Sequence, residues 1–204
     1  MDFHIIIIII TCAVSIIAFG TRALMWRFQL NAWSVAVRKQ YFRLFFYGFV
    51  HADWIHLLIN MMVLWSFGNA LIYFYNVIFN GNGALYFLLL YITAIPISAL
   101  YSVYKHKNDP NYNAVGASGA VSAVVYATIF LRPYTLLRFW GIPVPGIVFG
   151  IVYLVYSYIM ARRKRDNIGH DAHFWGAVYG FLFSGLFKPS LFAEFFGQLF
   201  FILN

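Results

Sequence analysis

Long runs of apolar residues, broken by short polar or charged segments, set the pattern of this chain. A helix needs about 20 apolar residues to cross a bilayer, so these runs predict six membrane-spanning helices. Their expected ranges are 3–20, 51–72, 84–103, 113–131, 143–161 and 170–187. The last segment, 189–204, is too short to cross and carries Glu194 and Gln198 one turn apart, so we expect an interfacial helix along the membrane surface. The pattern predicts one all-α membrane domain over residues 1–204.

The connection between the first two runs, residues 21–50, is unusually long and amphipathic, and we expect it to be embedded at the membrane interface. The N-terminal run follows Asp2 and His4 and lacks the basic region and cleavage site of a secretory signal, which favours a permanent span.

Composition supports a membrane protein, because 63% of the residues are hydrophobic and only 10% are charged. The net charge of +8 comes from basic residues in the short connections, which favours topology signals and lipid headgroup contacts over nucleic-acid binding. The single cysteine, Cys12, lies inside the first run and has no partner for an internal disulfide.

Polar residues are expensive inside a membrane, so those within the predicted spans are candidates for function. The second span contains His51, His56 and Asn60, and the last two are one helical turn apart on one face. The fourth span contains Ser118 near its start, and the sixth contains His173 near its start. Spans two, four and six enter the membrane from the same side, so these polar groups are expected to converge at one depth.

Small residues give the fourth and sixth spans faces that can meet closely. Gly119, Ala123 and Ala127 repeat every four residues on one, and Gly176 and Gly180 form a GxxxG pair on the other. Such packing brings Ser118 within reach of His173. A serine hydroxyl becomes a nucleophile when a base takes its proton, and neutral imidazole suits that task near pH 7.

The remaining polar groups fit the needs of acyl transfer. A tetrahedral oxyanion needs hydrogen-bond donors, which His56, Asn60 and the Ser118 backbone N–H can supply. No carboxylate is present to orient the histidine, so a two-residue dyad of Ser118 and His173 is the economical interpretation.

The motifs H-x4-H-x3-N, G-x-S-G and H-x2-G-x3-G on alternate spans resemble those of the rhomboid family of intramembrane serine proteases, in its bacterial six-helix form. The resemblance implies a six-helix rhomboid bundle, cleavage of transmembrane segments of other membrane proteins, and no cofactor or metal. Carried over by position, it implies that Ser118 is the nucleophile, His173 the general base, and His56 and Asn60 the oxyanion-hole side chains. It implies supporting positions at His51, Arg43, Gly116, Gly119, Gly176 and Gly180.

The chain departs from the family pattern at three places. Phe42 replaces the tryptophan that precedes the arginine in the first loop, and the acidic residue expected after Gly68 is missing. Ser122 stands where many members carry an aromatic residue that packs on the catalytic histidine, so we expect Trp175 or Tyr126 to support His173 instead.

Two other functions compete with the protease interpretation. A membrane metalloenzyme of the desaturase or hydroxylase type could gather the following residues into a nitrogen- and oxygen-rich cluster: His51, Asp53, His56, His170, Asp171 and His173. However, Asp171 lies about 200° from His173 around a helix, and a metal leaves the surroundings of Ser118 unexplained. A non-catalytic rhomboid-like binding protein is disfavoured because the nucleophile and the base are both present.

The route by which a substrate reaches Ser118 is also predicted. An intact substrate helix hides its carbonyls, so a helix-breaking segment is expected to enter from the lipid and unwind at Ser118. The fifth span begins with Gly141, Pro143, Pro145 and Gly146, which favours an irregular, adjustable end. Residues 162–165 are expected beside the catalytic mouth, where they would contact lipid phosphates or acidic substrate flanks.

The basic residues conflict with the family over orientation. Eleven lie on the side of the catalytic mouth, namely Arg22, Arg27, Arg38, Lys39, Arg43, Lys105, Lys107, Arg162, Arg163, Lys164 and Arg165. Only Arg132, Arg138 and Lys188 lie on the other side, so the positive-inside rule places the mouth in the cytoplasm. The resemblance implies a bacterial cytoplasmic membrane with the mouth facing outside. We favour the family orientation, because the arginines of an embedded first loop serve to fold that loop and do not indicate which side of the membrane it faces.

Overall fold

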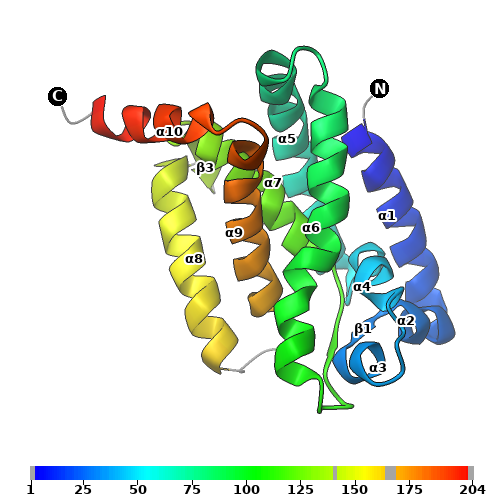
Figure 1. Ribbon diagram of the computed structural model, residues 1–204. Helices are drawn as coiled ribbons and strands as arrows, with labels where there is room; N and C mark the ends of the chain where they lie inside the picture. The colour runs from blue at the N-terminus through cyan, green and yellow to red at the C-terminus, as the bar shows by residue number, and fades with distance from the viewer. Residues whose placement is uncertain (1–2, 140–141, 164–168, 202–204) are drawn as a thin grey trace.

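A bundle of six helices dominates the computed structural model, which describes residues 3–139, 142–163 and 169–201. Within these residues the bundle consists of α1 (Phe3–Gly20), α5 (Trp54–Ile78), α6 (Gly83–His106), α7 (Ser118–Leu131), α8 (Gly146–Arg163) and α9 (His170–Phe187) (Figure 1). The all-α membrane fold predicted from the apolar runs is confirmed. Among the described helices, α1, α5 and α6 are long and apolar enough to cross a membrane by length and composition.

The central helix, α7, begins later than predicted and is too short to cross a bilayer alone. Its 14 residues span about 21 Å at ~1.5 Å per residue, against a hydrocarbon core of about 30 Å. The expected start at residue 113 was wrong because Asn113 and Ala114 form strand β2, and Gly116 has a φ of 118°, outside the helical region. Gly119 to Leu131 are all buried, so α7 is enclosed by protein on every side.

The second helix also begins later than predicted, at Trp54 instead of residue 51. The Asp53 carboxylate accepts a hydrogen bond of 2.7 Å from the backbone N–H of His56, and this N-cap sets the start of α5. His51 therefore lies in the extended segment that precedes the helix. At its other end α5 runs on to Ile78, beyond the predicted end at residue 72.

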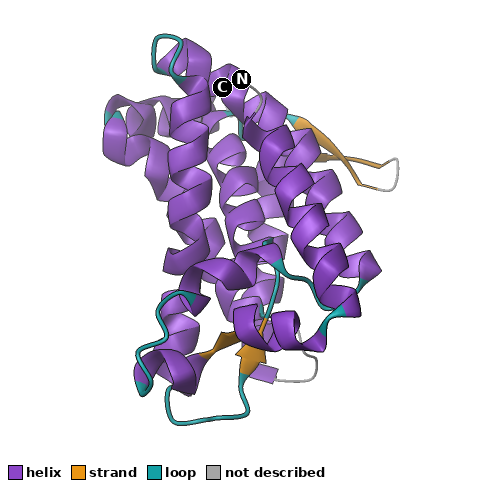
Figure 2. Ribbon diagram, turned by 90° about the vertical axis from the view of Figure 1, so that its right-hand side faces the viewer, coloured by secondary structure: helices purple, strands orange, loops and turns teal. Residues whose placement is uncertain are grey.

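The first loop is folded into short elements that pack at the lower end of the bundle (Figure 1). They are α2 (Arg22–Phe28), β1 (Leu30–Asn31), α3 (Ala32–Ala36), α4 (Arg43–Phe46) and the 3-10 helix η1 (Tyr47–Phe49). Strand β1 pairs antiparallel with β2 (Asn113–Ala114), which ties this loop to the start of α7 (Figure 2). Trp26, Val37 and Tyr41 are exposed, as expected for a loop embedded at a membrane interface.

The segment before α8 is a regular β-hairpin, so the expectation of an irregular end was wrong. Strand β3 (Leu136–Phe139) pairs antiparallel with β4 (Ile142–Pro145), with Arg138 opposite Pro143 and Leu136 opposite Pro145. A two-stranded ribbon has only edge strands, where proline is tolerated because no second neighbour needs its N–H. Helix α8 therefore begins at Gly146 instead of residue 143. Gly141 lies outside the described residues.

The last helix, α10 (Ser190–Phe201), lies across the end of the bundle opposite the first loop (Figure 1). It packs Phe192 and Phe195 against Phe130 of α7, with ring centroids 5.2 and 5.3 Å from that ring. An interfacial position for this helix stays a prediction, and residues 202–204 lie outside the described residues.

Candidate active site

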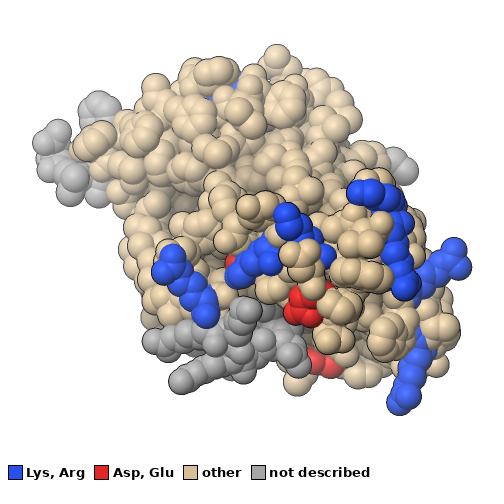
Figure 3. All heavy atoms as spheres, turned by 60° about the horizontal axis from the view of Figure 1, so that its bottom comes forward, with Lys and Arg blue, Asp and Glu red and all other residues tan. Residues whose placement is uncertain are grey.

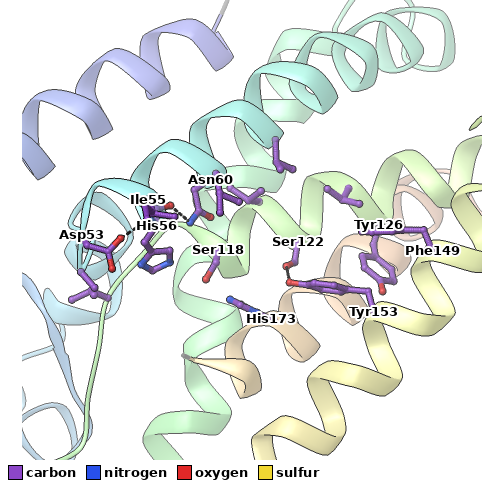
Figure 4. Close-up of a pocket in the computed structure, with 16 residues that line it drawn as sticks. Asp53, Ile55, His56, Asn60, Ser118, Ser122, Tyr126, Phe149, Tyr153 and His173 are labelled. Carbon is purple, nitrogen blue, oxygen red and sulfur yellow. Dashed lines mark hydrogen bonds between the residues drawn. The ribbon is translucent and has the colours of Figure 1, made fainter. Parts of the chain in front are cut away.

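A cavity of about 610 Å³ lies among α5, α7, α8 and α9. Its polar lining comes from residues far apart in sequence, namely Asp53 before α5, His56 and Asn60 of α5, Ser118, Ser122 and Tyr126 of α7, Tyr153 of α8 and His173 of α9. In Figure 4, Ser118 lies between His56 on one side and His173 on the other, and its hydroxyl and a ring nitrogen of His173 point toward one another. The structure thus brings together the two residues predicted as nucleophile and base.

Close packing of α7 on α9 makes this arrangement possible. A Cβ atom on Gly176 would overlap the backbone of Gly119, and one on Gly180 would overlap the backbone of Ala123. The two helices therefore meet backbone to backbone along the small-residue faces expected from the sequence. Because Ser118 precedes Gly119 and His173 lies three residues before Gly176, this contact fixes both side chains at the same level.

Gly116 is required for both its conformation and its size. Its φ of 118° is unfavourable for residues with a side chain, and a Cβ atom there would lie 2.6 Å from Cε1 of His56. The missing side chain allows the His56 ring to lie against the backbone just before Ser118. The first glycine of the G-x-S-G motif therefore allows α5 to lie close to Ser118.

Asn60 presents an amide to the cavity from the next turn of α5. Its Nδ2 donates a hydrogen bond of 2.8 Å to the backbone carbonyl of His56, and the side chain is almost fully buried. An amide nitrogen has two N–H donors, so the second remains for an oxygen atom in the cavity. Ser118 is the first residue of α7, and the N–H groups of a helix N-terminus favour negative charge.

His51 holds the start of α7 rather than lining the cavity. Its Nε2 accepts a hydrogen bond of 3.3 Å from the Ala117 N–H, and its Nδ1 lies 3.0 Å from the Ser15 hydroxyl. Ser15 also donates to the carbonyl of Phe49 at 2.9 Å. Because a backbone N–H can only donate, Nε2 carries no proton and Nδ1–H donates to Ser15. Burial, with the nearby His56, lowers the pKa of His51 to about 3 and keeps the ring neutral.

The acidic residues near the site have structural partners. Asp53 caps α5, as described above, and Asp171 forms an ion pair of 2.7 Å with Lys105 of α6. Among the described residues, no three His, Cys, Asp or Glu side chains are grouped so that they could hold a metal ion. The six-residue cluster considered for a metalloenzyme is therefore not assembled, because His51, Asp53 and Asp171 point to other partners.

Comparison with known proteins identifies the family of the chain. The sequence model of the Rhomboid domain matches residues 38–190, which is most of the chain. The chain belongs to the rhomboid family. This match includes every site residue named above except Ser15, which lies in α1, and so confirms the family suggested by the motifs.

Three rhomboid relatives show the extent of the similarity. RHOMBOID-like protein 12, mitochondrial, of Arabidopsis thaliana is 29% identical over 147 residues, covering 64% of this chain and 42% of the relative. Rhomboid protein 1, mitochondrial, of Saccharomyces cerevisiae is 27% identical over 145 residues, covering 67% and 39%. Presenilin-associated rhomboid-like protein A, mitochondrial, of Danio rerio is 28% identical, covering 68% and 35%. The matched segment spans less than half the length of each relative.

Ser122 stands where many rhomboids carry an aromatic residue that packs on the histidine, so the surroundings of His173 differ from that pattern. We expected Trp175 or Tyr126 to support His173. In the structure Trp175 packs on Tyr101, with centroids 5.5 Å apart, and the Tyr126 hydroxyl donates to the carbonyl of Gly150. Rings from two helices lie beside His173. His170 of the same helix contacts it edge to face, with centroids 5.7 Å apart, and Tyr153 of α8 lies nearly parallel to it, with centroids 6.1 Å apart and planes 20° apart. The only hint in the sequence is that Phe149 and Tyr153 are one turn apart on one face of the fifth span.

The arginine of the first rhomboid loop, Arg43, fastens α4 to α2. Its Nη1 donates to the carbonyls of Trp26 and Gln29, both at 2.8 Å, and its Nε donates to the side chain of Gln40 at 2.6 Å. Phe42, where the family has tryptophan, lies beside the Arg43 guanidinium, 5.4 Å from ring centroid to Cζ. Arg43 thus supports the loop and lies outside the cavity lining.

Proposed function

We propose that this rhomboid is an intramembrane serine endopeptidase that cleaves transmembrane segments of other membrane proteins. The observation that carries the proposal is the facing pair of Ser118 and His173 in a cavity whose opposite wall holds His56 and Asn60. Belonging to the rhomboid family supports it. No cofactor is needed for the reaction, because the dyad and the donors supply each chemical role.

In the first half of the reaction, His173 takes the proton of the Ser118 hydroxyl while the oxygen attacks a substrate carbonyl carbon. The carbonyl oxygen becomes an oxyanion, which the His56 ring, the second Nδ2–H of Asn60 and the Ser118 backbone N–H stabilise. His173 then gives its proton to the leaving amine nitrogen as the peptide bond breaks. The product is an ester between Ser118 and the substrate, plus a free amine.

In the second half, His173 takes a proton from a water molecule as the water oxygen attacks the ester carbonyl. The same donors stabilise the second oxyanion. The proton on His173 passes to the Ser118 oxygen as the ester bond breaks, which releases a carboxylic acid and restores the dyad. Both halves use one base and one set of donors.

The shape of the cavity favours an unwound substrate segment. Its walls carry apolar side chains of α5 and α7, including Ile59, Val63, Val121 and Val125, beside the polar groups. Such walls would receive apolar side chains, and the donors would receive a carbonyl that is no longer bonded within a helix. Membrane protein substrates and the lipid bilayer are therefore the partners that we propose, and nucleic acid is not among them.

The experiment uses the purified chain in liposomes with a model transmembrane substrate. We expect cleavage that is lost in Ser118→Ala and in His173→Ala, retained in the matched variant Ser66→Ala, and unchanged by a chelator. Cleavage by Ser118→Ala at the parent rate would overturn the mechanism. Loss of activity with the chelator, restored by metal, would favour the metalloenzyme. Substrate binding without any cleavage by the parent would favour a binding protein.

The protein is an integral membrane protein, and we propose a bacterial cytoplasmic membrane with the catalytic mouth facing outside. Figure 3 shows basic side chains spread over the lower end of the bundle, which is the end where the first loop packs in Figure 1. Arg22 and Arg27 belong to α2 and Arg43 belongs to α4, which supports our view that these arginines serve the folding of the loop and do not indicate which side of the membrane it faces. Labelling of a single cysteine at Val37, in a Cys12→Ser background, by an impermeant reagent on intact cells would support the outward orientation. Labelling only after lysis would overturn it.

The basic residues 162–165 were expected beside the catalytic mouth. Arg162 is exposed and its guanidinium lies 4.5 Å from the ring centroid of Tyr158, whereas residues 164 and 165 lie outside the described residues. We retain the proposal that this segment contacts lipid phosphates or acidic substrate flanks. Replacing all four residues with glutamine should alter cleavage of an acid-flanked substrate, and unchanged cleavage would contradict it.

A further inference from the structure

Tyr153 of α8 supplies an aromatic ring from a second helix that lies nearly parallel to the ring of His173. The two rings are nearly parallel, at 20°, with centroids 6.1 Å apart, and both residues line the cavity. A flat ring at this distance limits how far the imidazole can rotate away from Ser118. Tyr153 therefore lies where it can hold the orientation of the general base.

Neighbouring side chains fix the position of the Tyr153 ring. Phe149, one turn earlier on α8, stacks with it at 5.8 Å and 16°, and the Tyr126 ring of α7 lies 6.3 Å away. The Tyr153 hydroxyl lies 3.4 Å from the Ser122 hydroxyl. Ser122 is small enough to leave room for this ring and polar enough to bond it. The residue that departs from the family pattern on α7 is thus matched by a tyrosine on α8.

The helix that carries this ring lies at the edge of the bundle (Figure 1). Ile151, Val152 and Val155 of α8 are more than half exposed, which makes them lipid-facing in a membrane. In contrast, Ser118 and His173 belong to α7 and α9, which are packed backbone to backbone. The base is therefore held by one closely packed helix and supported by a ring from a peripheral one.

We propose that Tyr153 is a positioning residue for His173, so that the dyad is fully arranged only while α8 is packed against α7 and α9. This inference rests on the proposed function and adds a residue that the motifs do not contain. An outward displacement of α8 that separates the two rings removes the support from the base. The chemical step and the position of α8 are thereby coupled through one side chain.

Four variants test the role of the ring. Tyr153→Leu and Tyr153→Met remove it, and the methionine keeps much of the volume. Tyr153→Phe keeps the ring and removes only the hydroxyl. Tyr158→Leu is the matched control, because Tyr158 is on the same helix but half exposed, and its ring contacts Phe174 at 5.9 Å.

Two measurements are made on each variant in liposomes. The first is kcat and KM for a transmembrane substrate, and the second is the rate at which a fluorophosphonate probe labels Ser118. We expect Tyr153→Leu and Tyr153→Met to lower kcat and the labelling rate about 10-fold, with KM within about 2-fold, since misplacing a base affects the chemical step. We expect Tyr153→Phe to stay within about 3-fold of the parent and Tyr158→Leu to match it.

The outcomes distinguish a failure of the role proposed for Tyr153 from a failure of the proposed protease function. An unchanged kcat in Tyr153→Leu or Tyr153→Met would overturn the positioning role, as would a change confined to KM. Equal losses in Tyr153→Phe and Tyr153→Leu would overturn it as well, because the hydroxyl would then be the active group. A parent that neither cleaves substrate nor reacts at Ser118 would instead overturn the proposed function, and the inference with it.

Discussion

The backbone N–H of Ala117, the residue immediately before Ser118, donates a hydrogen bond of 3.3 Å to Nε2 of His51. The other nitrogen of the same ring reaches Ser15 of α1, 36 residues earlier in the chain. A chain of hydrogen bonds therefore runs from the first helix through one buried imidazole to the start of α7. Its two hydrogen bonds predict how distant changes affect the site.

Ser15→Ala should destabilise the protein, although Ser15 is remote from the cavity. The change leaves the Nδ1–H of buried His51 without its acceptor, which costs about 1–3 kcal/mol. Chemical denaturation in detergent measures the free energy of unfolding. Ser66→Ala is the matched control, because Ser66 donates only to Met62 of its own helix on an exposed face, and we expect little change there. Equal effects of the two variants would contradict this role of Ser15.

Acid should destabilise the protein through His51. Its folded pKa of about 3 lies below the ordinary value of 6.5, so below about pH 6.5 the unfolded chain binds a proton that the folded chain excludes. The free energy of unfolding should then fall by roughly 1.4 kcal/mol per pH unit as the pH drops from 6.5 toward 3. His51→Gln removes this contribution, and the difference between parent and variant isolates it because other groups titrate in both. Parallel stability curves would be the contrary result.

Gly176→Ala should separate α7 from α9. The new Cβ atom would overlap the backbone of Gly119, which cannot move without shifting Ser118. We expect a loss of stability of about 1–3 kcal/mol, with a loss of activity in addition. Gly197→Ala on α10 is the control, and it should raise the free energy of unfolding. A Cβ atom there meets no atom within 4 Å, and alanine stabilises a helix by about 0.5–1 kcal/mol relative to glycine. Destabilisation by both substitutions to the same extent would exclude the contact as the cause.

Arg43→Lys should loosen the first loop while preserving the charge. A single ammonium group cannot reproduce the bonds of the guanidinium to two carbonyls and a glutamine side chain, so we expect a loss of about 1–3 kcal/mol. Limited proteolysis within residues 21–50 provides a second, local measurement. Arg38→Lys serves as the control, because the exposed Arg38 side chain only packs over Trp33, 4.7 Å from the ring centroid. Equal protease resistance in Arg43→Lys and the parent would argue against this fastening role.

The bundle and the pairing of Ser118 with His173 were predictable because their causes are local in the sequence. Apolar runs determine the spans, and the small residues from Gly119 and from Gly176 repeat at the helical period. The start of α7 was not predictable, because strand pairing with β1 and the backbone of Gly116 decide it. Tyr153 was missed because its contact with His173 depends on how α8 packs beside α9. No short sequence motif predicts that packing.

The length of α7 has a consequence for hydrolysis in a membrane. A helix about 9 Å shorter than the hydrocarbon layer, and enclosed by protein throughout, allows its first residue, Ser118, to lie below the membrane surface. Water that arrives at Ser118 need never dissolve in lipid, since the surrounding helices replace the lipid along its path. For the proposed hydrolysis, a shortened central helix would thus serve in place of a channel that leads water through the lipid.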